Sequence, residues 1–190
     1  MRRNSLDPAV RPGLIITLVR VALRTPLGVC MAQLAPLPCH RLVPPVRTDV
    51  EDIFWLQSTI AAELAATATE RITDHDIDEL ERLNNRLAVA VELRDPDEIA
   101  RAELAFHWTF NGSSGRVKLA WFLLHTARYL PPQVFATDRS WGAGAVAGHA
   151  QLIDALRRRD ANSVVALTRS QFTDAATRLI AWLDQAGLWD

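Results

Sequence analysis

The sequence predicts an all-α protein, an antiparallel bundle of about six helices that follows a poorly structured N-terminal segment. From residue 46 onward, apolar residues recur at spacings of three and four, and typical helix-starting residues separate these stretches. Alternating apolar and polar runs with hairpin turns, which would indicate strands, are nearly absent. The 190 residues suffice for one domain with a core, and the 49% of hydrophobic residues argue against disorder of the whole chain.

The first 45 residues differ in composition from the rest. They hold six arginines and a single acid, whereas the remainder has 15 basic and 21 acidic residues. They end in the proline-rich PLPCHRLVPP, which favours extended backbone, and only about 14–24 allows a short helix. We therefore expect an irregular, basic, proline-rich segment over 1–45 and one all-helical domain over 46–190. The net charge of −1 argues against a protein whose bulk wraps nucleic acid.

The apolar stretch within this first segment does not resemble a membrane span. It is interrupted by Arg20, Arg24 and Pro26, so no run of about 20 apolar residues exists. The same interruptions fit a secretory signal poorly. Two cysteines, Cys30 and Cys39, are too few for a disulfide framework. We expect a cytoplasmic protein without a membrane partner.

The first two helices are predicted from their N-terminal signals. Thr48 and Glu51, three residues apart, form a capping-box pattern, and Thr73 and Asp76 repeat it. The first helix is expected to turn inward Ile53, Leu56, Ile60, Leu64 and Ala68. The second is expected to turn inward Ile77, Leu80, Leu83, Leu87 and Val91. Its early acids and its late Arg94 match the helix dipole.

Four more helices follow. Asp95 precedes a proline at the first helical position of the third helix, which is expected to end at Asn111-Gly112. The fourth is predicted over about 115–130, before Pro131-Pro132, and the fifth over about 143–159. Asp160 is the predicted N-cap of the sixth, which ends near Gly187. One face of the sixth helix carries Val165, Phe172, Ala176, Leu179 and Leu183.

Three ionisable side chains occupy positions where apolar ones are expected. Glu103 and His107 lie four apart on the apolar stripe of the third helix, and His149 lies on that of the fifth. Burying such groups costs several kcal/mol unless something satisfies them. A surface pair for Glu103 and His107, and a core histidine bonded to a backbone carbonyl for His149, are the alternatives. A carboxylate with two imidazoles is a donor set that transition metals accept, so we predict a metal or an anionic ligand.

Three other side chains are weaker candidates. Gln171, beside the apolar face of the sixth helix, is either a weak metal ligand, a partner of an inward water, or a boundary residue. His125 and Arg128 are candidate contacts for an anionic effector, with packing and a surface ion pair as the alternatives. No nucleophile motif, P-loop or dinucleotide fingerprint occurs, so we expect no enzyme. A metal hydrolase that uses the buried carboxylate and imidazoles is a further alternative.

Four stretches carry a family resemblance: AATATERIT, IDELERLN, ELAFHWTF and GHAQLIDALRRRDANSVVAL. The last combines a histidine, an apolar stripe and an aspartate that opens the final helix. With these stretches the chain resembles, from about residue 46 to 185, the C-terminal effector domain (FCD) of bacterial GntR-superfamily regulators of the FadR subgroup. The resemblance implies an antiparallel bundle of six or seven helices that senses a small carboxylate or acyl effector and forms a homodimer.

The resemblance also implies a metal site. In the metal-containing branch of the family, an acid and a histidine four apart and two further histidines bind a divalent metal that helps to hold the effector. Glu103, His107 and His149 match the first three positions, and Gln171 stands at the fourth. Zn²⁺, Ni²⁺ or Mn²⁺ is therefore the implied cofactor. Its affinity should be lowered, because an amide is a poorer ligand than an imidazole.

The chain departs from the family at two other places. Gln57 and Ala61 stand where many members have Arg and Glu, which implies a ligand contact at Gln57 and a different or more weakly bound effector. The family places a winged helix-turn-helix before this domain, whereas residues 1–45 are too short for one. We expect that DNA reader to be missing or replaced, with DNA binding only if a reader is supplied elsewhere. A reader-less helical module that only dimerises, without ligand, is the alternative function.

Overall fold

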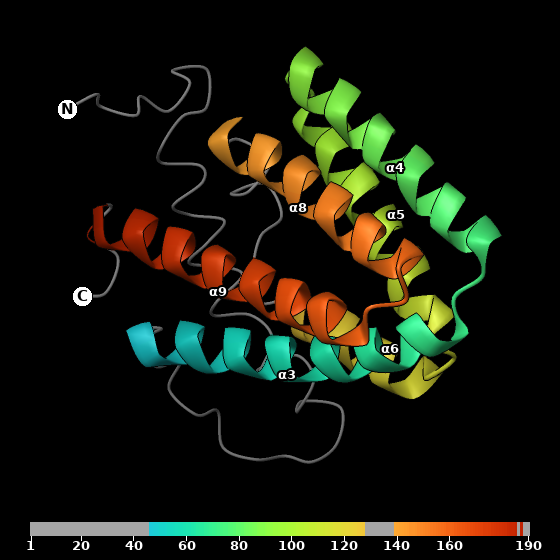
Figure 1. Cartoon of the computed structure of the whole chain (residues 1–190). Helices are drawn as coiled ribbons and strands as arrows, with labels where there is room; N and C mark the ends of the chain where they lie inside the picture. Colours follow the sequence, from blue (N-terminus) through green and yellow to red (C-terminus); the bar gives the residue numbers. More distant parts are fainter. Residues whose placement is uncertain (1–45, 128–138, 186, 188–190) are drawn as a thin grey trace, which may run out of the picture.

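The computed structural model describes residues 46–127, 139–185 and 187, and this part contains six α-helices and no strand (Figure 1). The helices are α3 (Arg47–Arg71), α4 (Asp74–Leu93), α5 (Pro96–Ser113), α6 (Val117–Ala127), α8 (Arg139–Arg157) and α9 (Ala161–Gln185). The predicted all-α bundle is therefore confirmed for these residues. The segment predicted over 1–45, the two cysteines, Arg128 and the proline stop at 131–132 lie outside the described residues.

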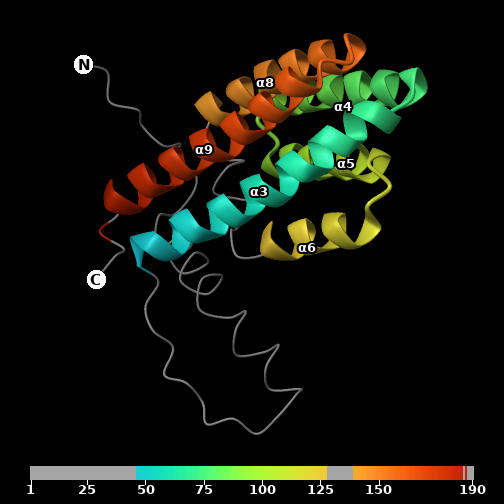
Figure 2. The ribbon, with the colours of Figure 1, turned by 60° about the horizontal axis from the view of Figure 1, so that its bottom comes forward.

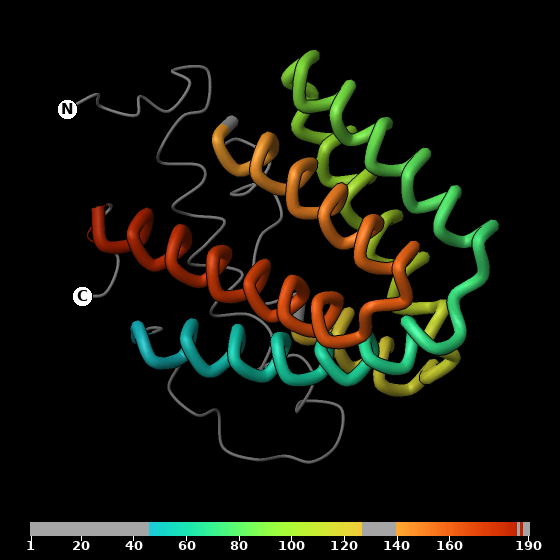
Figure 3. The backbone as a smooth tube through the Cα atoms, viewed as in Figure 1, coloured from blue at the N-terminus to red at the C-terminus, as the bar shows by residue number. Residues whose placement is uncertain are grey.

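The long helices pack as antiparallel neighbours. α3 and α9 run side by side (Figure 3), and Arg47 at the start of α3 pairs with Asp184 near the end of α9 at 3.5 Å. α4 packs against both α5 and α8, and Arg157 at the end of α8 reaches Asp78 at the start of α4. α6 lies at the edge of the bundle against α3, on the side away from α8 (Figure 2). The core is thus formed mainly between α3, α4, α5, α8 and α9.

Three of the four predicted N-caps are confirmed. The Thr73 hydroxyl accepts from the backbone N–H of Asp76 at 3.1 Å, and the Asp95 carboxylate accepts from the first turn of α5. The Asp160 carboxylate accepts from the backbone N–H of Ser163 at 3.1 Å. These side chains satisfy N–H groups that have no partner within the helix.

The predicted cap at Thr48 is wrong. α3 begins one residue earlier, at Arg47, with Val46 as its N-cap, and the Asp49 carboxylate accepts from the Val46 backbone N–H at 2.9 Å. Thr48 therefore lies inside the first turn, and Glu51 pairs with Arg47 instead. The other boundaries differ by a few residues: α5 continues to Ser113, α6 begins at Val117, and α8 extends over 139–157 rather than 143–159.

The inward face of α3 is also rotated relative to the prediction. Leu56 is 40% exposed, whereas the next residue, Gln57, is 3% exposed. The buried line of α3 runs through Phe54, Ala61 and Leu64, and Gln57 falls on it at helical spacing. The amide is therefore taken into the interior, and the leucine is left at the edge.

α4 and α8 approach closely where α8 carries a glycine. A Cβ at Gly142 would stand 2.7 Å from a methyl group of Val91, closer than real side chains allow. The glycine therefore permits the contact between the two helices. No helix within the described ranges is both long and apolar enough to cross a membrane.

Candidate metal centre

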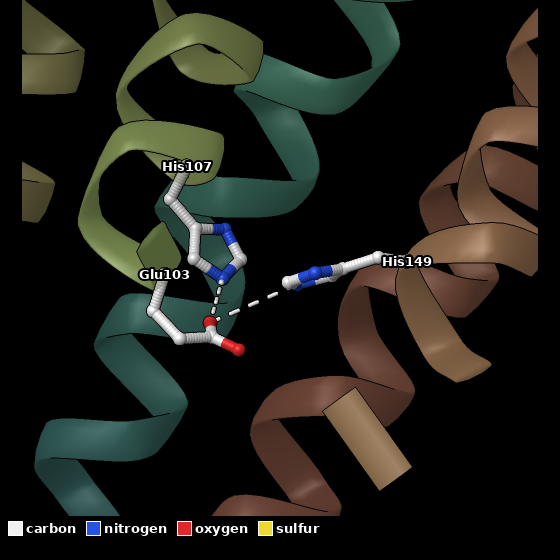
Figure 4. A group of neighbouring side chains, drawn as sticks. All are labelled: Glu103, His107 and His149. Carbon is white, nitrogen blue, oxygen red and sulfur yellow. Dashed lines mark ion pairs between the residues drawn. The ribbon is translucent and has the colours of Figure 1, made fainter. Parts of the chain in front are cut away.

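Glu103, His107 and His149 converge on one point between α5 and α8 (Figure 4). The Nε2 atom of His107 lies 3.4 Å from Oε2 of Glu103, and Nε2 of His149 lies 3.8 Å from the same oxygen. One ligand atom from each residue lies within 4.8 Å of the others. The grouping predicted from the sequence for these three residues is therefore found in the structure.

The local helix geometry explains how the three side chains meet. Glu103 and His107 are one turn apart on α5, so they stack on the same flank of the helix. Phe106, on the same helix and fully buried, lies flat against the imidazole of His149, with ring centres 3.8 Å apart. The His107 ring meets the His149 ring edge-on at 5.2 Å. Phe106 thus fixes the plane in which His149 can offer its ring nitrogens.

The three side chains are buried to different degrees. His149 is 2% exposed, whereas the side chains of Glu103 and His107 are 27% and 38% exposed. Within the described residues, Oε1 of Glu103 and Nδ1 of His149 are nevertheless buried without a hydrogen-bond partner. A buried acceptor without a partner costs about 1–3 kcal/mol of folding free energy. These atoms therefore destabilise the fold unless another species binds them.

Burial and neighbouring groups shift the pKa values of His149 and Glu103. Burial lowers the pKa of His149 to about 4; the carboxylate of Glu103 opposes this shift, and His107 adds to it. Burial acts to raise the pKa of Glu103, but the hydrogen bond from His107 and the charge of the two imidazoles leave that pKa below its usual value. His149 is therefore neutral and Glu103 ionised at pH 7, which are the forms that bind metal ions.

The donor set fits a divalent transition metal. Metal–ligand bonds of about 2.0–2.2 Å place two ligand atoms at most about 4.4 Å apart, on opposite sides of the ion. The ligand atoms here lie within 4.8 Å of one another, so a small side-chain adjustment would bring them within that limit. Two imidazoles and one carboxylate suit Zn²⁺, Ni²⁺ or Mn²⁺, and three protein ligands leave further coordination positions open.

The other predicted site residues lie in different surroundings. The Nε2 atom of Gln171 on α9 is buried without a partner and would stand 3.5 Å from a Cβ at Gly148, next to His149 in the chain. Gln57 on α3 is likewise buried with an unpartnered Nε2. His125 is not part of the three-residue group: its Nδ1 lies 2.8 Å from the backbone oxygen of Trp121, against whose ring it packs.

The sequence reasoning missed a buried polar residue that links two helices. Asn84 on α4 is 7% exposed, donates from Nδ2 to the backbone oxygen of Val146 at 3.0 Å, and keeps a buried, unpartnered Oδ1. The signal for it was present, because Asn84 lies four residues after Leu80 and three before Leu87, on the inward stripe of its helix. Its role in the structure is to join α4 to α8.

Comparisons with known proteins agree with this fold. The family model described as the FCD domain matches residues 52–174. No curated protein matches the chain by sequence. The structure is similar to that of Escherichia coli McbR/YncC (17% identity, TM-score 0.66), with 92% of this chain and 96% of that chain covered. It is also similar to that of Streptococcus agalactiae GntR (19% identity, TM-score 0.55), with 68% of this chain and 58% of that chain covered. At such identities the two structures show likeness of fold, whereas the family match confirms the resemblance carried by the sequence motifs.

Proposed function

The chain belongs to the FCD-domain family, and on this basis we propose that it is the effector-sensing and dimerisation domain of a GntR-type bacterial transcription regulator of the FadR subgroup. Its ligand is a small carboxylate or acyl compound, bound inside the helical bundle with the help of a divalent metal. The names of the two similar structures, McbR/YncC and GntR, support the regulator class. In regulators of this class, DNA binding belongs to a winged helix-turn-helix, and the setting that we propose is the cytoplasm.

The observation that carries this proposal is the convergence of Glu103, His107 and His149 with buried atoms that have no partner. These residues would hold the ion, and Gln171 or a water would complete its shell. When bound, the ion supplies open coordination positions at which a carboxylate oxygen can bind. Phe106 stacks on the imidazole of His149 and so holds that ligand in place.

The same geometry supports a sensing role. Two of the donors come from α5 and one from α8, so an ion bound to all three would bridge these two helices. Binding to all three donors therefore favours one spacing of α5 and α8 over others. In a dimer, a ligand with unequal affinity for two such spacings shifts the population between them, and attached reader domains would follow.

A second candidate is a helical module that dimerises without ligand. The observation that favours it is Gln171, whose amide is a poor metal ligand at the position beside Gly148. In this case, waters would satisfy the buried atoms of Glu103 and His149, and the module would pair with itself or with relatives. It predicts self-association that no metal or small carboxylate changes.

Thermal melting separates the two candidates. The full chain is melted after chelator treatment and then with Zn²⁺, Ni²⁺ or Mn²⁺ added. Metal at 100 times its dissociation constant should stabilise the fold by about 2.7 kcal/mol, which is about 5–11 °C in Tm for a chain of this size. His107→Ala should abolish the rise, whereas His75→Ala, which removes an exposed histidine at the start of α4, should keep it. A Tm that no metal changes in the unaltered protein would refute the metal-assisted sensor and favour the ligand-free module.

A further inference from the structure

Two apolar clusters between α4, α5 and α8 meet at a polar level of the bundle. In one cluster, toward the start of α8, Val146 packs against Leu87, Ala90, Ile99 and Ala102. The other cluster, toward the end of α8, includes Leu80, Leu83, Phe106, Leu152 and Ile153. Asn84 separates the residues that α4 contributes to the two clusters, and His149 separates those that α8 contributes. Asn84 and His149 therefore occupy the same boundary.

Asn84 makes a directional contact at this boundary. Its Nδ2 donates to the backbone oxygen of Val146 at 3.0 Å, and the residue is 7% exposed. The apolar contacts on either side have no preferred direction. In contrast, a buried amide nitrogen that loses its acceptor is penalised by the full cost of its desolvation. The hydrogen bond from Asn84 therefore opposes a shift or a rotation of α8 against α4.

His149 depends strongly on where α8 lies. The ring of a metal-binding histidine is usually oriented by a hydrogen bond from its second nitrogen. Among the described residues, the Nδ1 atom of His149 has no such partner, and stacking on Phe106 fixes only the plane of the ring. The position of the ring is then set by the backbone of α8. Val146, whose carbonyl Asn84 holds, lies three residues before His149 and on the same side of the helix.

The first half of α8 needs this support. Gly142, Gly144 and Gly148 all precede His149, and glycine weakens a helix. The ion pairs of Arg157 with α4 lie at the other end of α8. Of the hydrogen bonds described between α4 and α8, the one from Asn84 therefore acts nearest to His149.

We propose that Asn84 is a positioning residue of the metal centre. By holding Val146, it keeps His149 where its Nε2 can join Glu103 and His107 in binding a divalent metal. This inference rests on the proposed function and adds to it a residue that does not touch the ion. It implies that metal affinity and folding stability respond differently to changes along the contact between α4 and α8.

The variant Asn84→Leu tests this role, because leucine has nearly the size of asparagine but donates no hydrogen bond. Zn²⁺ affinity of the full chain is measured by competition with a chromophoric chelator, and Tm is measured without metal. We expect the affinity to fall about tenfold or more. Tm should not fall, since the unpartnered Oδ1 is removed and the Val146 oxygen keeps its place within the helix. Asn85→Leu, at the exposed neighbouring position, is the matched control and should leave the affinity unchanged.

Two outcomes of this experiment would overturn the proposal. An unchanged Zn²⁺ affinity in Asn84→Leu would show that His149 is placed without the hydrogen bond. A joint fall of Tm and affinity would reduce Asn84 to a structural role. If the leucine variant does not fold, Asn84→Ala, which is too small to clash with α8, takes its place. Its affinity is then compared with that of Leu83→Ala, which removes a buried side chain from the same turn and should leave the affinity unchanged.

Two further variants show whether Asn84 acts through His149. His149→Ala removes the ligand itself, so the loss of Zn²⁺ affinity in Asn84→Leu should be smaller than in His149→Ala. A loss as large or larger would mean that Asn84 supports the whole site, and would reject the positioning role. Gly142→Ala disturbs α8 seven residues before His149 while Asn84 still holds Val146, so it should lower Tm without changing the affinity. An equal loss of affinity in Gly142→Ala would also reject a specific role for Asn84.

Failure of the positioning role and failure of the proposed function are distinguishable. Zn²⁺ binding by the unaltered protein, and its loss in His107→Ala, depend on the metal centre alone. If this binding is present and Asn84→Leu leaves it unchanged, only the positioning role is refuted. If the unaltered protein binds no Zn²⁺, the metal-assisted sensor is refuted, and the positioning role with it.

Discussion

The two sides of α8 are built in opposite ways. Toward α4 the helix is anchored at both ends: Arg157 reaches Asp78 at 3.0 Å and Glu81 at 2.6 Å, and Gly142 lets the first turns pack against Val91. Toward α5 it presents His149, whose Nδ1 is buried without a partner. Both faces belong to the same helix, so the difference between them does not come from a difference in helix stability. The side facing α4 holds the fold, whereas the side facing α5 keeps polar atoms available at a cost in stability.

The largest expected effect is the loss of stability at acidic pH, where the environment of His149 opposes its protonation. In metal-free protein, His149 binds a proton in the folded state only below a pKa of about 4, whereas an unfolded histidine does so below about 6.5. Between these values the unfolded chain holds more protons, so the free energy of unfolding falls as the pH falls from about 6.5 to 4. The loss due to this residue should be about 3 kcal/mol. Urea unfolding in the presence of chelator, at steps between pH 7 and pH 4, measures it.

The variant His149→Leu isolates the contribution of that residue. Carboxylates with lowered pKa, such as Asp76 and Asp160, also lose stabilising interactions in acid, so only the difference between the two proteins reports on His149. The variant should be less sensitive to pH over the same range and at least as stable as the unaltered protein at pH 7, since it removes an unpartnered buried nitrogen. Parallel pH curves for the two proteins would mean that His149 is not the buried, neutral group described above.

Much of the helical scaffold was predictable from sequence, because the signals that start its helices are local. Thr73, Asp95 and Asp160 act through hydrogen bonds to N–H groups within three residues, and apolar residues at helical spacing indicate which face turns inward. The grouping of Glu103 with His107 is local as well. Their proximity to His149 followed from the family resemblance and from the cost of burying an ionisable side chain.

The parts that sequence did not predict depend on neighbouring helices. Leu56 and Gln57 are adjacent on α3, and the positions of α9 and α6 against α3 decide which of the two is buried. A rotation of α3 about its axis by one residue would exchange them. Thr48 has the composition of a cap, yet Asp49 captures the Val46 N–H and starts the helix earlier. Asn84 is polar on an apolar stripe, and its hydrogen bond to Val146 requires α8, which lies some sixty residues away along the chain.

The second prediction concerns the close contact on the α4 side and compares two glycines of α8. Alanine at Gly142 would place its Cβ 2.7 Å and 3.2 Å from the two methyl groups of Val91, whereas alanine at Gly144 would meet only Arg178 Nη2 at 3.9 Å. Overpacking costs about 1–3 kcal/mol, and alanine in place of glycine gains up to about 1 kcal/mol in a helix. Gly142→Ala should therefore destabilise the fold by about 1–2 kcal/mol, and Gly144→Ala should stabilise it slightly. Denaturant unfolding measures both.

A double variant shows whether the contact with Val91 is the cause. Gly142→Ala combined with Val91→Ala should lose less free energy of unfolding than the sum of the two single changes, because the shortened side chain makes room for the new Cβ. Additive losses would place the cost of Gly142→Ala elsewhere on α8. Metal affinity, measured alongside, should remain unchanged in all of these variants, since none touches the side of α8 that faces α5.

The smallest predicted effect concerns the start of α4, next to the residues that anchor the end of α8. The Thr73 hydroxyl accepts from the Asp76 N–H at 3.1 Å and donates to the Asp76 carboxylate at 2.7 Å, so Thr73→Ala should cost about 1 kcal/mol of unfolding free energy. Thr73→Ser keeps both hydrogen bonds and should cost much less. Thr48→Ala is the matched control: Thr48 lies within the first turn of α3 and provides no cap, so this change should leave stability the same or slightly higher. Equal losses in Thr73→Ala and Thr48→Ala would mean that the hydroxyl of Thr73 does not hold this end of α4. The side of α8 facing α4 would then depend on its ion pairs and on the contact with Val91.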